Sequence, residues 1–592
     1  MLDLSRLTDE QRQAVIAPDG PLLLLAGPGT GKTTVLAARM AYLVTVRELA
    51  PASILAITFT RAAGRALRWR VAGMLGPRAR DRQAGLPDIM TFHAFGWRVI
   101  RQWWQELGFG HERLLVYGRE QAESTLRQVT EQLGMDLRQQ SLPELLQAVN
   151  RFRLTGGDVA NQDRIAPLAL HFEDLLRRRN AVDFTAMLAL PPRLLQREVA
   201  ALRLYQDAYR SILLDEFQDV TDTEYDLARK LAEQHRNLTA AGDPAQCLYG
   251  WRGADVRLIE RFQQDFAATR LCALTENFRS TGRLIAAANA LGSHLEDQPW
   301  LRTQNPDGLA PVVYAAQDEQ AEATYVAEEI RRLVAAGQIA SLSDVAVLYR
   351  AKQQALEITL ALRARHIPFH IRGSVDLLAR REVRDAVNYL RLADNPADGH
   401  ALARIVNVPP RRLGRLASQL LDQPVATSAL VQVAAGLSPE VARAAQQLVE
   451  LVEQLHGVRG RASPAQLLDA VIEVTGYGAW LQGQPGGGER LRSLEALRSW
   501  LARLDEDLTD WLASVVSGED TDLAGADADR IALATIHAAK GDEWPVVFIV
   551  GFEEALLPHY RAVADEPFSP GAVEEELRVA YVGLTDRDSA CT

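Results

Sequence analysis

Cysteine is scarce in this chain. Its 592 residues include three, Cys247, Cys272 and Cys591, and no two of them have a CxxC spacing. The sequence therefore excludes a disulfide-stapled scaffold and a cysteine zinc site, and it favours a reducing compartment. Long hydrophobic runs are also missing: the longest near the start is Leu22 to Ala26, which is too short for a signal peptide or a membrane span. We therefore expect a cytoplasmic protein without a membrane partner.

Lysine is rare compared with arginine. Only four of the 65 basic side chains are lysines, namely Lys32, Lys230, Lys352 and Lys540. Because arginine supplies the generic positive charge, a lysine is a candidate for a position where a compact ammonium is needed. Chance retention is the alternative at any one of the four.

Net positive charge is also lacking. The formal net charge of -11 would, taken alone, argue against a nucleic-acid partner. The charge is unevenly distributed, however. Residues 61–119 contain eleven arginines and four acids, whereas residues 503–530 contain nine acids and two arginines. The acidic stretch accounts for most of the excess, so the net charge does not exclude a local basic surface.

Short apolar runs predict buried parallel strands at 22–26, 54–58, 212–214, 345–348 and 546–550. Helical patterns follow most of them, which is typical of α/β layers. Two strand-poor stretches, 92–205 and 374–526, predict helices. The fold class we expect is α/β with two parallel-sheet cores, each carrying an inserted helical subdomain. The expected boundaries are 1–91 with 206–275 for the first core and 276–373 with 527–592 for the second, with insertions at 92–205 and 374–526.

The strongest local motif is a glycine-rich loop between the run ending at Ala26 and a helical pattern. The loop reads Gly27-Pro28-Gly29-Thr30-Gly31-Lys32-Thr33. This context is that of a P-loop, in which backbone N–H groups and a helix N-terminus bind phosphate oxygens. Lys32 is expected at the terminal phosphates and the Thr33 hydroxyl at Mg²⁺. The motif predicts ATP and Mg²⁺ as ligands.

A carboxylate pair follows the apolar run 212–214. Asp215 stands at the carboxyl end of that predicted strand, where ligands bind in open α/β sheets. We expect Asp215 to hold Mg²⁺ and Glu216 to accept a proton from the attacking water. Acidic pairs at strand ends also serve as helix caps, so the P-loop is what favours the catalytic interpretation.

Further motifs occur in a fixed order. They are Gln11 after Leu7-Thr8-Asp9-Glu10, Thr58-Phe59-Thr60, Thr91-Phe92-His93, Asp215-Glu216-Phe217-Gln218-Asp219, Gly242-Asp243-Pro244-Ala245-Gln246, Tyr249-Gly250-Trp251-Arg252-Gly253, Asn277-Phe278-Arg279-Ser280 and Thr535-Ile536-His537-Ala538-Ala539-Lys540-Gly541. Together they resemble superfamily 1A DNA helicases of the UvrD, Rep and PcrA type. The resemblance covers nearly the whole chain and implies two RecA-like cores.

The resemblance also implies roles at the nucleotide. Gln11 would bind the adenine edge and Phe278 would stack on the base, while Arg279 would contact the γ-phosphate. Gln246 would couple nucleotide state to DNA, and Glu543 would contact the ribose. A capping box with Thr8 is the alternative role for Gln11.

At the strand, four aromatic residues would stack on unpaired bases: Phe59, Phe92, Tyr249 and Trp251. Four further residues, His93, Arg252, His537 and Lys540, would contact the strand or its phosphates. Isolated aromatic residues more often belong to a core. RNA is not excluded by stacking residues alone.

The last motif departs from the family. Residues 574–585 follow it closely, but Asp586 stands where a second γ-phosphate arginine is usual, and the second core is expected to be truncated. A single-base frameshift after Thr585 would explain both features. A genuine Asp586 would repel the γ-phosphate and predicts weak ATPase.

The function implied is an ATP-dependent DNA helicase. It would move 3′ to 5′ on single-stranded DNA and unwind 3′-tailed duplex in repair or replication restart. Two alternatives remain open: a hydrolysis-poor, ATP-binding DNA switch, and the motor subunit of a helicase–nuclease complex.

Overall fold

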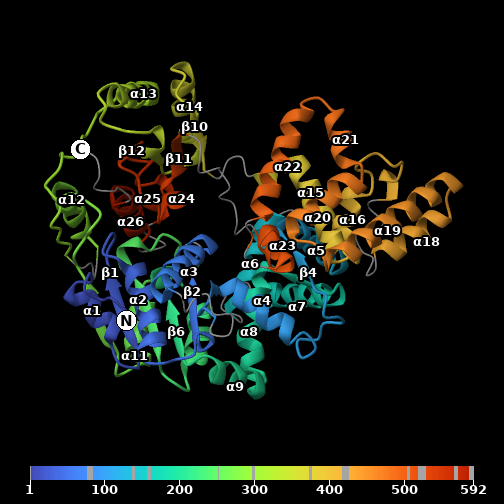
Figure 1. Cartoon of the computed structure of the whole chain (residues 1–592), viewed down its shortest axis with the longest axis horizontal. Helices are drawn as coiled ribbons and strands as arrows, with labels where there is room; N and C mark the ends of the chain where they lie inside the picture. Colours follow the sequence, from blue (N-terminus) through green and yellow to red (C-terminus); the bar gives the residue numbers. More distant parts are fainter. Residues whose placement is uncertain are drawn as a thin grey trace. The chain divides into compact units, whose positions relative to one another are not determined.

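The computed structural model describes residues 2–76, 85–135, 141–155, 162–250, 253–295, 300–372, 377–416, 426–502, 504, 507–517, 529–565 and 571–585. The chain folds into two compact units (Figure 1). Unit 1 comprises Met1–Phe92, Leu195–Ser374 and Ala524–Thr592, and unit 2 comprises His93–Leu194 and Val375–Leu523.

Unit 1 contains a six-stranded parallel sheet. Its strands are β1 (Leu22–Ala26), β2 (Ile54–Thr58), β3 (Asp88–Thr91), β6 (Ser211–Leu214), β7 (Leu238–Gly242) and β8 (Arg270–Leu274). Their order is β3-β2-β6-β7-β1-β8, and Leu24 of β1 pairs with Ala241 on one side and Cys272 on the other. Strands β1, β2, β6 and β7 are almost wholly buried, as expected for a parallel sheet covered on both faces.

Helices surround this sheet. They are α1 (Asp9–Ile16), α2 (Lys32–Thr45), α3 (Arg61–Leu75), α9 (Val199–Ala208), α10 (Asp222–Ala232), α11 (Leu258–Asp265) and α12 (Gly282–Gly292). Side-chain caps begin several of them: Thr8 and Thr221 form capping boxes, and the Thr60 hydroxyl accepts from Ala63 N–H. Helix α2 begins instead at Gly31, in the left-handed region and without a side-chain cap. Its first N–H groups are therefore not satisfied by a capping side chain.

A buried arginine joins α1 to α2. Arg39 is 1% exposed, and its Nη1 donates to the carbonyls of Ala14, Val15 and Ala17 at 3.0–3.3 Å, while Nε donates to Thr239 Oγ1. Carbonyls at the end of a helix lack intrahelical partners, so this guanidinium satisfies the end of α1. Burial lowers the pKa of Arg39 to about 10. The contact holds α1, and with it Gln11, against the helix that follows the P-loop.

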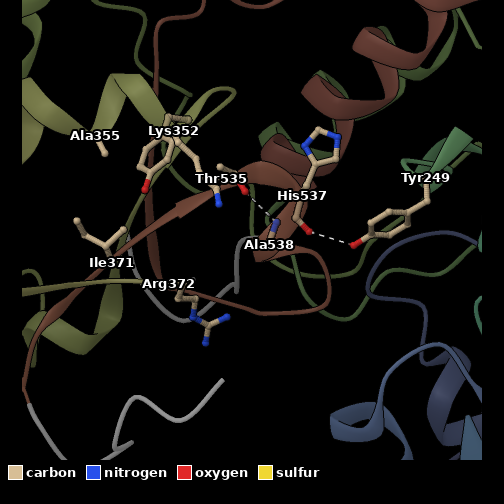
Figure 2. Close-up of a pocket in the computed structure, with 9 residues that line it drawn as sticks. Tyr249, Lys352, Ala355, Ile371, Arg372, Thr535, His537 and Ala538 are labelled. Atoms are coloured by element: carbon tan, nitrogen blue, oxygen red, sulfur yellow. Dashed lines mark hydrogen bonds between the residues drawn. The ribbon is translucent and has the colours of Figure 1, made fainter. Parts of the chain in front are cut away.

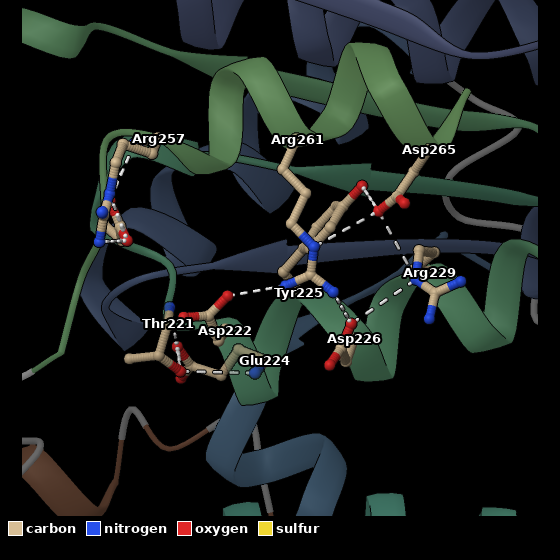
Figure 3. A network of polar contacts seen from close by, with 10 residues as sticks. Thr221, Asp222, Glu224, Tyr225, Asp226, Arg229, Arg257, Arg261 and Asp265 are labelled. Carbon is tan, nitrogen blue, oxygen red and sulfur yellow. Dashed lines mark hydrogen bonds and ion pairs between the residues drawn. The ribbon is translucent and has the colours of Figure 1, made fainter. Parts of the chain in front are cut away.

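Helices α10 and α11 are joined by a polar network (Figure 3). Arg261 of α11 donates to Asp222 and Asp226 of α10 at 2.7 and 2.6 Å. The Tyr225 hydroxyl donates to Asp265, and the Arg261 guanidinium lies 5.2 Å from the Tyr225 ring centre. The network anchors the far end of the segment that leads from β7 to α11, which carries Gln246 and Tyr249.

Unit 1 also contains a four-stranded parallel sheet. Its strands are β9 (Val345–Tyr349), β10 (Phe369–Ile371), β11 (Ile531–Thr535) and β12 (Val546–Val550), in the order β10-β11-β9-β12. The helices associated with this core are α13 (Glu319–Ala335), α14 (Ala355–Ala364), α24 (Ile536–Ala539), α25 (Tyr560–Asp565) and α26 (Ala572–Thr585). The Arg350 guanidinium, just after β9, forms hydrogen bonds with both Glu576 oxygens and so holds α26 to this sheet.

Unit 2 is mainly helical. Its first segment has α4 (Phe92–Gln102), α5 (Arg119–Gln132), α6 (Leu142–Thr155), α7 (Gln162–Arg178) and α8 (Phe184–Arg197), with β4 (Leu115–Tyr117) paired to β5 (Ala181–Asp183). Its second has α15 (Arg381–Asp394), α16 (Gly399–Ile405), α18 (Ala426–Ala435), α19 (Pro439–Arg459), α20 (Pro464–Val474), α21 (Tyr477–Gln482), α22 (Gly487–Leu501) and α23 (Leu508–Ser517). Buried Arg153 binds both oxygens of Asp183 at 2.6 and 2.7 Å.

The structure confirms the predicted fold class, because both sheets are parallel and each is interrupted in the sequence by a long helical stretch. All five predicted strands form. The pair β4–β5 was missed because three residues are too few to show a periodicity. Within the described residues, no helix is both long and apolar enough to span a membrane. The boundaries of the four predicted domains stay predictions.

Candidate nucleotide site and strand-binding surface

The P-loop connects β1 to α2. Two of its glycines have positive φ, +66° at Gly29 and +83° at Gly31. A Cβ on Gly29 would lie 2.5 Å from Asn277 Nδ2, and one on Gly31 would lie 2.7 Å from Gln11 Nε2. Glycine is therefore required by both backbone conformation and space. The first N–H groups of α2 have no side-chain cap and lie at the P-loop, where they can donate to phosphate oxygens.

The P-loop lysine is paired with a carboxylate at the end of β6. Lys32 Nζ lies 2.9 Å from Glu216 Oε1, and Glu216 N–H donates to Asp215 Oδ1 at 3.0 Å. Glu216 itself has a positive φ of +52°, a conformation that is uncommon for a residue with a side chain. The sequence-predicted residues Lys32, Asp215 and Glu216 therefore lie together.

The pKa shifts of these three groups differ in direction. Burial alone would lower the pKa of Lys32, but the negative charges of Glu216 and Asp215 outweigh it and raise that pKa. Burial, followed by the charge of Glu216, raises the pKa of Asp215. Burial acts in the same direction on Glu216, but Lys32 and then Lys540 prevail and lower its pKa. Glu216 is thus the charged partner of Lys32, whereas Asp215 is a buried carboxyl that a cation would stabilise.

A hydrogen-bonded chain leads away from Glu216. Gln218 Nε2 donates to Glu216 Oε2 at 2.5 Å, and Gln218 Oε1 accepts from Asp243 N–H at 2.9 Å. Asp243 Oδ2 then accepts from Gln246 Nε2 at 2.8 Å. Burial raises the pKa of Asp243 to about 6. Gln246 is therefore connected to the Lys32–Glu216 pair through fixed side chains and not by direct contact.

Arg279 reaches the same region from the segment after β8. Its Nη2 is hydrogen-bonded to Glu543 Oε1 and its Nη1 donates to the Thr585 carbonyl at 3.4 Å. Among the described residues its buried Nε has no hydrogen-bond partner. The segment is fixed to the P-loop, because Asn277 Nδ2 donates to Pro28 O at 2.6 Å and Phe278 N–H donates to Gly29 O. An unsatisfied guanidinium nitrogen next to the P-loop fits an anionic ligand.

Gln11 and Phe278 differ in accessibility. Gln11 is 5% exposed: its Oε1 accepts from Thr8 N–H, which completes the capping box, and its Nε2 donates to Thr30 O at 2.9 Å. The capping alternative is thus realised, and the amide also contacts the P-loop. The Phe278 ring is 50% exposed and available for stacking. The adenine role of both residues stays a prediction.

The donor set suits Mg²⁺ bound together with phosphate. Among the described residues no three His, Cys, Asp or Glu side chains cluster as a metal site. Mg²⁺ typically uses one or two protein oxygens and completes its shell with phosphates and waters. Thr33, in the first turn of α2, and the buried carboxyl of Asp215 supply oxygens of that kind. The residues present fit the ion.

Lys540 connects loops of the two sheets of unit 1. It follows α24, and its Nζ donates to Asp219 Oδ2 and to the Gln246 carbonyl. Its side chain is 7% exposed and that of Asp219 is fully buried. The pair raises the pKa of Lys540 despite the opposing effect of burial. In this structure the ammonium serves an internal contact, and its contact with a DNA strand stays a prediction.

Tyr249 is the centre of an aromatic surface. Its ring lies 4.7 Å from the Phe59 ring, and Lys540 Nζ lies 5.5 Å from its centre. Its hydroxyl donates to the His537 carbonyl at 3.3 Å. The structure therefore brings together Phe59, Tyr249, His537 and Lys540, which come from three separate motifs.

A cavity of about 380 Å³ adjoins this surface (Figure 2). Its walls include Tyr249 and His537, together with Tyr349, Lys352 and Arg372. Burial, then the positive charge of Arg350, lowers the pKa of His537 to about 4, so the imidazole is neutral at pH 7. The sequence interpretation missed three of these residues. Two signals pointed to them: Tyr349 directly follows the predicted strand 345–348, and Lys352 is one of the four lysines.

The other residues predicted to contact a DNA strand are not part of the surface around Tyr249. The Phe92 side chain is 6% exposed, so a base would reach it only after its neighbours moved. The His93 ring stacks on Phe184 at 3.7 Å within unit 2. Trp251, Arg252 and Asp586 lie outside the described residues.

Comparison with known proteins gives matches along nearly the whole chain. The UvrD/REP helicase N-terminal domain matches residues 7–267, and the UvrD-like helicase C-terminal domain matches residues 272–457 and 442–587. ATP-dependent DNA helicase UvrD1 of Mycobacterium tuberculosis is 33% identical over 636 aligned residues, which cover 98% of this chain and 81% of that protein. ATP-dependent DNA helicase PcrA of Bacillus subtilis is 32% identical over 622 residues, covering 98% and 82%. The chain, with its P-loop, Asp215–Glu216 pair and two parallel sheets, belongs to the UvrD/Rep helicase family.

Proposed function

We propose that this protein is an ATP-driven DNA motor that moves 3′ to 5′ along a single strand and unwinds 3′-tailed duplex. One observation carries the proposal: Lys540 contacts Asp219, which follows β6, and Gln246, which follows β7 beside the P-loop strand β1, while its ammonium also lies against the ring of Tyr249. A change at the nucleotide can thus reach the strand-binding surface through contacts of a few ångströms.

The chemistry proposed is hydrolysis of ATP. Lys32 and the N–H groups at the start of α2 bind the phosphates, and Arg279 stabilises charge that develops on the γ-phosphate. Glu216 accepts the proton of the attacking water, since its lowered pKa keeps it ionised. Mg²⁺, held by Thr33 and Asp215, would supply charge neutralisation at the phosphates when bound. Gln11 and Phe278 would hold the base, and Glu543 the ribose.

ATP also has a local consequence for Arg279. In the structure its guanidinium donates to Glu543 and to the Thr585 carbonyl. A γ-phosphate is a stronger anionic partner than a backbone carbonyl, so binding would redirect Arg279 toward the P-loop. Thr585 ends α26, so the contact between Arg279 and this helix of the second core would depend on whether ATP is bound.

On the strand side, Phe59 and Tyr249 would stack on bases without regard to sequence. The cavity beside them would accept a base or a phosphate near Lys352 and Arg372. Trp251, Arg252, Phe92 and His93 are proposed to extend this path. The biological setting proposed is DNA repair or replication restart.

A test of this function combines two measurements. Single-stranded DNA is expected to stimulate ATPase activity, and Lys32→Ala to abolish it. Strand separation is expected on a 3′-tailed duplex and not on a 5′-tailed one. ATPase activity that ignores single-stranded DNA would contradict the proposal, and unwinding from the 5′ tail would contradict the direction.

A hydrolysis-poor switch is the second candidate, favoured by one observation in the sequence. Asp586 directly follows Thr585, whose carbonyl contacts Arg279. A carboxylate near the γ-phosphate would oppose negative charge developing there. Tight ATP binding with negligible turnover, relieved by Asp586→Arg, would support this candidate. Strong turnover of the unaltered chain would exclude it.

A further inference from the structure

Helix α3 has an unusual surface. Its fifteen residues include four arginines and no acid, and Trp69 is 79% exposed. None of these side chains has a role in the nucleotide site or at the Phe59–Tyr249 ring pair described above.

The polar and apolar residues of α3 lie on different sides. Gly64, Leu67, Val71 and Leu75 are spaced by three or four residues and are buried. Arg61, Arg65 and Trp69 are spaced by four residues and share one side of the helix, and Arg68, three residues after Arg65, flanks that side. We call these four residues the α3 stripe. It extends over eight residue steps, about 12 Å along the helix axis.

The stripe begins at the predicted strand-binding surface. Phe59, which stacks on Tyr249, precedes the Thr60 cap of α3, so Arg61 stands two residues after the stacked ring. At the other end, one Arg68 nitrogen donates to the Ile89 carbonyl at 2.8 Å and fixes the helix to β3. Arg65 and Trp69 are both exposed between these ends.

Arginine with an exposed aromatic ring is the combination that binds single strands irrespective of sequence. An acidic peptide would satisfy the charges but gives no reason for a helix that begins directly after Phe59 to expose an aromatic ring. We propose that the α3 stripe is an additional contact for the unpaired DNA strand, in which Arg61 and Arg65 bind phosphates and Trp69 stacks on a base beyond the Phe59–Tyr249 pair. The proposal rests on the DNA-motor function above and extends its strand path.

The test compares Trp69→Ala and Arg65→Ala with the full-length wild type. Affinity is measured by fluorescence anisotropy on labelled oligo-dT of roughly 5 and roughly 20 nucleotides, without nucleotide, over a range of salt. Trp69→Ala is expected to weaken binding of the long oligonucleotide roughly tenfold and to leave the short one unchanged. Arg65→Ala is expected to reduce the slope of log affinity against log salt by about 0.7, the value for one phosphate contact.

Matched controls are Trp300→Ala and Arg332→Ala, which remove a 66% exposed tryptophan and a 56% exposed arginine elsewhere in unit 1. Both are expected to bind like the wild type. If both stripe variants bind the long oligonucleotide as tightly as the wild type, the proposal is overturned. DNA-stimulated ATPase, and with it the proposed function, would be unaffected by that result. Equal losses on short and long oligonucleotides would also overturn it, because the effect would then act through the ring pair. A wild type that binds neither oligonucleotide would refute both.

Discussion

Lys540 and Asp219 form a buried ion pair between loops of the two sheets of unit 1. Removing one partner of a buried pair leaves an uncompensated charge, whereas removing both does not. Lys540→Met is therefore expected to lower the free energy of unfolding by about 3–5 kcal/mol. Urea unfolding of this variant gives the value.

The double variant Asp219→Leu with Lys540→Met is the control. It is expected to regain most of the lost stability but not DNA-stimulated ATPase, since the contact with the Gln246 carbonyl is also lost. A double variant no more stable than the single one would show that the pair does not act as a unit.

Glu216→Gln keeps the size of the side chain but removes the base. It is expected to lower kcat for ATP by roughly 100- to 10,000-fold while ATP still binds, because Lys32 and the P-loop remain. Steady-state ATPase and equilibrium nucleotide binding separate the two effects. Glu233→Gln, an exposed carboxylate just after α10, is the matched control. Wild-type turnover in the Glu216 variant would exclude this residue as the base.

Tyr249→Ala is expected to weaken single-stranded DNA binding by about 1–3 kcal/mol, since it removes a stacking ring. Tyr249→Phe retains the ring next to Phe59 and loses only the 3.3 Å hydrogen bond to His537. It should bind almost like the wild type. If anisotropy shows equal losses for both variants, the hydroxyl matters and stacking does not.

Arg39→Met is expected to destabilise the chain by at least about 3 kcal/mol, because three carbonyls at the end of α1 would lose their donor. Arg47→Met is the control: Arg47 is 37% exposed and pairs with Asp19, so it should cost less than about 1 kcal/mol. Thermal unfolding compares them. If the two variants lose similar amounts of unfolding free energy, the buried carbonyls at the end of α1 have found other hydrogen-bond donors.

His537 makes stability depend on pH. Its pKa in the folded protein is about 4, lower than the 6.5 of an unconstrained histidine, because burial and then Arg350 and Lys540 oppose its charge while Glu576 favours it. Between these values the unfolded chain binds more protons, so stability falls as pH drops from 6.5 to 4, by at most about 3 kcal/mol.

Urea midpoints at pH 7.5 and pH 5 measure this fall, and His537→Asn is expected to reduce it. A wild type and variant with the same pH dependence would place the proton uptake elsewhere.

The sequence predicted the features that depend on local pattern. The strands 22–26, 54–58 and 546–550 form with the predicted limits, because continuous apolar runs between turn residues are distinctive. The strands β7, β8 and β11 were not predicted, because short apolar runs such as RLCAL and IALAT cannot be distinguished from buried helix segments by periodicity alone. At the site, the motifs predicted that Lys32, Asp215 and Glu216 serve one nucleotide, whereas the contact between Lys32 and Glu216 came from the structure alone.

Other features depend on tertiary structure. The burial of Phe92 and the internal contact of Lys540 arise from segments hundreds of residues apart, which motif order does not encode. The hydrogen bonds that join Gln218, Asp243 and Gln246 were not predicted either, although all three residues belong to recognised motifs.

Because lysine is scarce, an amine-directed reagent has few sites on this protein at which it can react. Two of the four ε-amines, those of Lys32 and Lys540, are held in ion pairs and are 11% and 7% exposed. Lys352 is exposed on the wall of the cavity, and Lys230 is partly covered on α10. Acylation of lysine under mild conditions should therefore concentrate on Lys352. Protection of that one amine by an oligonucleotide would report, by mass spectrometry, whether the cavity is filled.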